Sequence, residues 1–158
     1  MNADKNRQKS PMNLFKQIVI VLMVMVVATS CTSNSGELEV QNVWSRSSPS
    51  VAQNGVFYMT IINNSNQNDL LLSVQTEACG AAELHEIVMQ ENGLMGMRPV
   101  ERGVVEVLAG EMVELKTGGL HVMCLDKQIE FEAGVEIPLT LFFEQAGEVA
   151  VTAVVRDS

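Results

Sequence analysis

From residue 38 onward, short β-type segments alternate with turn residues, and no stretch has the 3.6-residue periodicity of an amphipathic helix. Residues 55–63 (GVFYMTIIN) are rich in β-branched and aromatic side chains, which predicts a central strand. This pattern is typical of an all-β sandwich or barrel. The predicted strands are 38–44, 55–63, 70–75, 82–90, 94–98, 104–108, 112–115, 120–125, 137–143 and 148–155, and residues 77–80 are predicted to be a loop.

The first 31 residues differ from the rest of the chain. Lys5, Arg7, Lys9 and Lys16 precede an apolar run over residues 18–28. That run is too short for a membrane-spanning helix, which needs about 20 apolar residues. The sequence Ala28-Thr29-Ser30-Cys31 resembles a bacterial lipobox. We therefore predict that residues 1–31 are a lipoprotein signal peptide whose lipobox ends at a lipidated Cys31. The alternative is ordinary cleavage with Cys31 left as a free thiol.

Residues 32–37 are small and polar, which predicts a flexible tether to a folded domain over 38–156. The expected location is extracytoplasmic, in the periplasm or on the outer face of the cell membrane, with the lipid on Cys31 as the anchor. Without the leader, six basic residues stand against eighteen acidic ones, a net charge of about −12. The sequence has no basic stripe with interleaved aromatic residues, so nucleic-acid binding is excluded.

Two cysteines remain after Cys31, and exported proteins occupy compartments that permit disulfides. We predict a bridge between Cys79 and Cys124. The alternative is that both thiols are buried and pack as small apolar side chains.

The only two histidines, His85 and His121, are each followed or preceded closely by methionines. In a strand over 120–125, His121 and Met123 project from the same face. Imidazole and thioether groups are neutral donors, and soft thioethers select Cu(I). The combination predicts a Cu(I) site, whereas each residue alone is more often a hydrogen-bonded histidine or a core methionine. The other methionines near the histidines are Met89, Met95 and Met97.

The register of the hairpin around Asn92-Gly93 decides which methionine shares a face with His85. A two-residue turn places His85 opposite Val100 and turns Met97 to the other face. A three-residue loop over 91–93 places Ile87 opposite Met97, on the face of His85. Met95 and Met97 share a face in either register, so parity does not choose between them.

Several short segments together resemble a known family over about residues 38–155. They are VWSR (43–46), YMT (58–60), ELHE (83–86), MRPV (97–100), GGLHVM (118–123) and PLTL (138–141). These segments are similar to the periplasmic CuA copper chaperone family (PCuAC-like). The resemblance implies a cupredoxin- or immunoglobulin-like Greek-key β-sandwich that carries Cu(I) and delivers it toward assembly of the CuA site of cytochrome c oxidase.

By that resemblance, the metal ligands are His85, Met97, His121 and Met123. The implied partners are the copper ion and either a cytochrome c oxidase subunit or a thioredoxin-like copper-assembly protein. The gap from His85 to Met97 and the gap from Met97 to His121 are both longer than the family commonly has. Ile87 stands where many members carry a methionine. The His/Met-rich tail of some members is absent from this sequence, so we expect a single copper site in a monomer.

Other functions predict different features. An electron-transfer cupredoxin needs a cysteine thiolate beside two histidines and a methionine, but strand alternation turns Cys124 away from His121. A metal-free, structural immunoglobulin-like surface lipoprotein would bind no copper. An enzyme is not expected, because the two histidines have no positioned nucleophile or paired catalytic acid around them. Glu83 and Glu86 flank His85, and on a solvated strand they need no role in catalysis.

Overall fold

The computed structural model describes residues 38–91 and 93–157, so the predicted signal peptide, Cys31 and the tether lie outside the described residues. In these ranges the chain forms strands and one short 3-10 helix, η1 (Glu101–Gly103), and no helix there could span a membrane. The strands are β1 (Leu38–Arg46), β2 (Gly55–Asn63), β3 (Asp69–Gln75), β4 (Cys79–Met89), β5 (Met95–Pro99), β6 (Val105–Val107), β7 (Met112–Leu115), β8 (His121–Lys127), β9 (Glu136–Phe143) and β10 (Gly147–Arg156).

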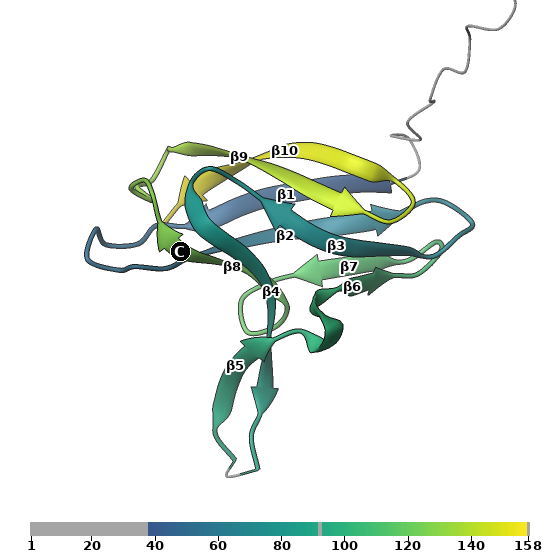
Figure 1. Ribbon diagram of the computed structural model, residues 1–158, viewed down its shortest axis with the longest axis horizontal. Coiled ribbons are helices and arrows are strands. Elements are labelled where there is room, and N and C mark those ends of the chain that lie inside the picture. The colour runs from purple at the N-terminus through teal and green to yellow at the C-terminus, as the bar shows by residue number, and fades with distance from the viewer. Residues whose placement is uncertain (1–37, 92, 158) are drawn as a thin grey trace, which may run out of the picture. The chain divides into compact units, whose positions relative to one another are not determined.

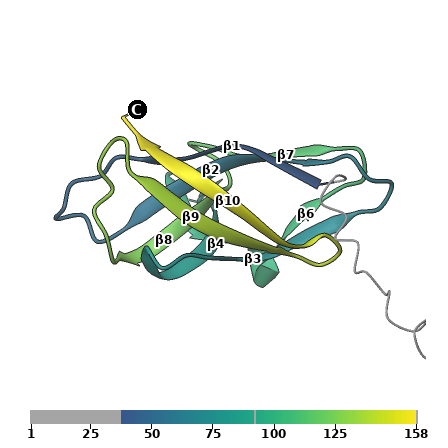
Figure 2. The same cartoon turned by 90° about the horizontal axis from the view of Figure 1, so that it is seen from above.

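The strands pair in the order β5-β4-β8-β2-β1-β10-β9-β3-β6. β7 lies outside this order and pairs with the second half of β2, whose first half pairs with β8. β1 pairs with β2 on one side and, in parallel, with β10 on the other. Figure 1 shows β9 and β10 running along one side of β1 and β2, and Figure 2 shows the same strands from above. Buried residues of β2 and β9, among them Phe57 and Leu141, belong to one hydrophobic core. The predicted all-β, cupredoxin-like sandwich is confirmed.

Strand β4 begins earlier than the sequence predicts. Residues 77–80 were expected to form a loop, yet Cys79 already pairs with Lys127 of β8. The partner strand extends β4 through a pairing that local turn propensity does not report. The loop prediction is therefore wrong at Cys79 and Gly80.

The β4–β5 hairpin changes partners at His85. β4 pairs with β8 from Cys79 to His85 and with β5 from His85 to Met89. Beyond His85 the hairpin is therefore a two-stranded ribbon, and Figure 1 shows it projecting away from the other strands.

Of the two registers considered for the β4–β5 hairpin, the structure has the one with a three-residue loop. The Gln90 backbone N–H donates to the Leu94 carbonyl at 2.8 Å, and the Gly93 N–H donates to the Gln90 carbonyl at 2.9 Å. Gly93 has a φ of 77°, a left-handed conformation that glycine adopts without steric cost. In this register Met97 lies opposite Ile87, so Met97 is on the face of His85.

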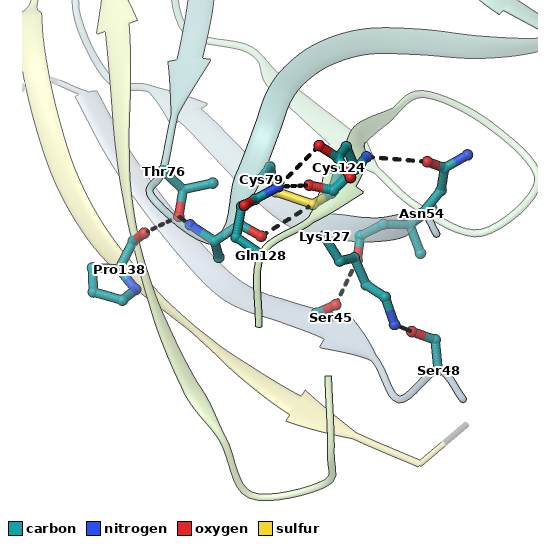
Figure 3. The surroundings of a disulfide bond; sticks show 12 residues. Ser45, Ser48, Asn54, Thr76, Cys79, Cys124, Lys127, Gln128 and Pro138 are labelled. Atoms are coloured by element: carbon teal, nitrogen blue, oxygen red, sulfur yellow. Dashed lines mark hydrogen bonds between the residues drawn. A yellow bond between two sulfur atoms is a disulfide. The ribbon is translucent and has the colours of Figure 1, made fainter. Parts of the chain in front are cut away.

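The predicted Cys79–Cys124 disulfide is confirmed. Both cysteines are buried, and their Cα atoms lie 5.4 Å apart, within the range that a disulfide spans. Figure 3 shows the bond and the side chains around it. The disulfide links β4 to β8, which are the two strands that carry the histidines.

Candidate metal centre

His85 and His121 face each other across the β4–β8 pair. They are directly opposite in the strand register, and their ring centroids lie 6.0 Å apart with the planes tilted by 55°. A metal–nitrogen bond of about 2.0 Å, as found for zinc, places two imidazoles that share an ion roughly 5–6 Å apart between centres. The two rings therefore stand at a separation that one metal ion can bridge.

A hydrogen bond to the preceding loop sets the tautomer of His121. Its Nδ1 lies 2.9 Å from the Gly119 carbonyl oxygen. A carbonyl oxygen only accepts hydrogen bonds, so Nδ1 carries the proton and Nε2 keeps a free lone pair. The loop is held by the Lys116 N–H, which donates to the Leu120 carbonyl at 2.7 Å. His121 is only 3% exposed, so Nε2 is shielded from water.

A carboxylate sets the opposite tautomer in His85. The Nε2 atom of His85 lies 3.0 Å from Oε2 of Glu83, which is two residues earlier on the same face of β4. An ionised carboxylate is an acceptor, so Nε2 carries the proton and Nδ1 keeps the lone pair. Metal-binding histidines commonly donate their other ring N–H to a carboxylate or a backbone carbonyl, and the two histidines here show one case of each.

The two free lone pairs have no hydrogen-bond partner. Among the residues that the structure describes, Nδ1 of His85 and Nε2 of His121 are the only buried side-chain nitrogens or oxygens left unpaired. An unsatisfied buried polar atom costs about 1–3 kcal/mol, so two on facing residues call for an explanation. Coordination of one metal ion by both atoms would remove both penalties.

The two predicted methionine ligands flank the histidine pair. Met123 lies two residues after His121 and opposite Glu83, and it is half-buried. Met97 lies diagonally across from His85, a position from which a long side chain can reach its neighbour. In the strand register the two methionines therefore lie on opposite sides of the histidine pair. Met95 is two residues farther from His85 along β5, so the register favours Met97.

The described cysteines do not offer a thiolate, because Cys79 and Cys124 are bonded to each other. In residues 38–91 and 93–157, no group of three or more His, Cys, Asp or Glu side chains is arranged to hold a metal ion. Apart from the Glu83 carboxylate, which accepts from Nε2 of His85, the donors at this place are two imidazoles and the thioethers beside them. Such a neutral set suits a soft monovalent ion better than a hard divalent one.

Comparison with known proteins places the chain in a family. The model of the family described as "Putative lipoprotein LpqE-like" matches residues 38–155. A protein of Rickettsia prowazekii (strain Madrid E) is 28% identical over 105 residues, which is 64% of this chain and 56% of that protein. A Leifsonia xyli subsp. xyli protein named "Putative lipoprotein Lxx21020" is 28% identical over 95 residues, 60% of this chain and 56% of that protein. The chain spans just over half the length of these relatives.

Solved structures share the fold. The apo PCuAC domain from PmoF1 is 30% identical and has a TM-score of 0.65, with 78% of this chain and 96% of that domain covered. The copper-bound PCuAC domain from PmoF2 is 22% identical and has a TM-score of 0.64, with 78% and 95% covered. At 22% identity the second likeness shows the fold alone, whereas the first, at 30% identity over nearly the whole domain, also shows a family relationship.

Proposed function

Because the chain belongs to the LpqE-like family and carries a PCuAC domain, we propose that it is an extracytoplasmic metallochaperone for Cu(I). The observation that carries this proposal is the pair of buried, unpartnered ring nitrogens on facing residues His85 and His121. The copper-bound relative supports the identity of the metal. The lipoprotein names of the family and of one relative support the location.

We assign the ion to Nδ1 of His85, Nε2 of His121 and the Sδ atoms of Met97 and Met123. All four donors are neutral, so the ion enters and leaves by ligand exchange without proton release or a change in oxidation state. Met97 is 48% exposed, whereas His121 is buried. Of these four donors, an incoming acceptor would therefore meet the Met97 thioether first, and the histidines would release the ion last.

Delivery toward the CuA site of cytochrome c oxidase remains a proposal that rests on the family resemblance. The recipient would be an oxidase subunit or a thioredoxin-like assembly protein, and lipidation of Cys31 would hold the chaperone at the membrane that carries them. Mass spectrometry of the membrane-extracted protein tests the anchor. An unmodified Cys31 or an intact leader would contradict it.

The two rival functions account for less of the geometry. An electron-transfer cupredoxin requires a thiolate, and both described cysteine sulfurs are in the disulfide. A metal-free structural lipoprotein would not explain why two buried imidazole nitrogens have no hydrogen-bond partner. We therefore propose binding and transfer of copper rather than electron transfer, adhesion or catalysis.

An anaerobic competition titration with the Cu(I) chelator bathocuproine disulfonate tests the function. We expect the wild type to retain one Cu(I) per chain against the chelator, and Met123→Leu to retain it less well. Met112→Leu is the matched control, because Met112 is 56% exposed on β7 and belongs to no part of the site. A wild type that yields all its copper at the lowest chelator excess would contradict the proposal.

A further inference from the structure

The projecting half of the β4–β5 hairpin carries methionines on one face only. Met89 and Met95 are directly opposite each other, and Met97 is opposite Ile87. Since side chains alternate along a strand, all three methionines share the face of His85. Half of the six methionines that follow residue 31 are therefore aligned on one side of a short ribbon.

The other face of the ribbon carries charged and amide side chains. There Arg98 donates to Oε1 of Glu86 from Nε at 3.0 Å and from Nη2 at 2.9 Å. The side chain of Gln90 lies against Gly96, so closely that a Cβ at Gly96 would meet it. The thioethers are thus segregated from the charged and amide groups of the same hairpin.

Exposure of the methionines increases away from the histidines. Met97 is 48% exposed, Met95 61% and Met89 72%. These are large apolar side chains that solvent reaches, in the part of the hairpin beyond His85 where β4 pairs with β5 alone. Side chains that only pack a hairpin would be buried, whereas an exposed thioether is free to bind a soft ion.

We propose that Met89 and Met95 form an outer, weak Cu(I) site that passes the ion to and from the histidine centre through Met97. The inference rests on the proposed function, because an outer site needs an inner one to serve. Directly opposite residues have Cβ atoms about 4.5–5.5 Å apart. Metal–sulfur bonds of about 2.3 Å let two sulfurs on one ion lie up to about 4.6 Å apart, which flexible methionine side chains can reach.

The step from the outer site to the inner one is an exchange of ligands. Residues two apart on a strand are separated by about 7 Å, so Met97 lies next to Met95 on one side and diagonal to His85 on the other. The Cu–S bond to Met89 breaks as one to Met97 forms, and the bond to Met95 breaks as a histidine nitrogen binds, so the ion stays monovalent throughout. With two thioethers alone the outer site holds the ion weakly, which suits passage rather than storage.

Silver(I), a redox-stable soft monovalent ion, provides the test. The full mature protein is labelled with [methyl-¹³C]methionine, and the methyl signals are followed as Ag(I) is added. We expect the signals of Met97 and Met123 to move during the first equivalent. Those of Met89 and Met95 should then move together in excess Ag(I), at least about threefold farther than that of the control Met112, which is also exposed.

The variant Met89→Leu tests the pairing. It keeps an apolar side chain at the position, so we expect the hairpin to fold and the response of Met95 to fall at least about threefold. If Met89 and Met95 move no farther than Met112 while Met97 and Met123 respond, the outer site is refuted and the proposed function stands. If Met97 and Met123 do not respond to the first equivalent, both proposals fail.

Discussion

His85 and His121 have their free lone pairs on different ring nitrogens, and each tautomer has a separate cause. Glu83 accepts from Nε2 of His85, and the Gly119 carbonyl accepts from Nδ1 of His121. The sequence predicted the residue types of the site and the shared face of His121 and Met123. It did not predict the tautomers, because these depend on a loop carbonyl and on the distance between two side chains. Neither of these is encoded in residue spacing.

Removal of one histidine should abolish tight copper binding. His121→Ala deletes a donor that the fold holds in a buried position. We expect Cu(I) affinity to fall by more than the roughly 10–100-fold that loss of an outer-shell partner costs. A chelator competition against the wild type measures this loss, with circular dichroism to verify the fold. An unchanged affinity would remove His121 from the site.

Glu83 should act on the metal through His85. In Glu83→Ala the imidazole loses the carboxylate that orients it, and we expect Cu(I) affinity to fall by about 10–100-fold. Glu86→Ala is the matched control, because Glu86 pairs with Arg98 on the opposite face of the hairpin. Equal losses in the two variants would show that general charge, and not orientation of His85, is responsible.

At the scale of elements, local pattern located most strands and left one register open. The bounds of β2 and β7 agree with the prediction, since both segments carry clear strand propensity between turn residues. Asn92-Gly93 signalled a hairpin but not its loop length. The observed register places Arg98 opposite Glu86 and Met95 opposite Met89. Such cross-strand pairs stabilise one alignment, and turn residues alone do not reveal them.

Strain in the hairpin loop should loosen β5 without unfolding the domain. Gly93→Val places a branched side chain at a φ of 77°, which costs about 1–2 kcal/mol. Because β5 pairs only with β4, we expect faster amide hydrogen exchange in β5 and an unchanged melting temperature. Gly110→Val, at a φ of 72° in another loop, is the control. Slower or equal exchange in β5 would contradict this account.

At the scale of the whole molecule, the disulfide ties together the strands that carry the histidines. It closes a separation of 45 residues, for which chain entropy predicts a stabilisation of about 4 kcal/mol. We expect the double variant Cys79→Ala/Cys124→Ala to unfold at a clearly lower guanidinium concentration. Its Cu(I) affinity under native conditions should remain close to that of the wild type, since neither sulfur is a ligand. Unchanged stability would mean that the bridge contributes little to the fold.

The central claim is that one Cu(I) ion is shared by Nδ1 of His85 and Nε2 of His121. Long-range ¹H–¹⁵N correlation spectra of the imidazole rings, recorded without metal and after one equivalent of Cu(I), test it most directly. The account predicts that these two nitrogens shift on binding, while Nε2 of His85 and Nδ1 of His121 stay protonated. Binding through the opposite nitrogen of either ring, or no shift in one of the rings, would contradict it.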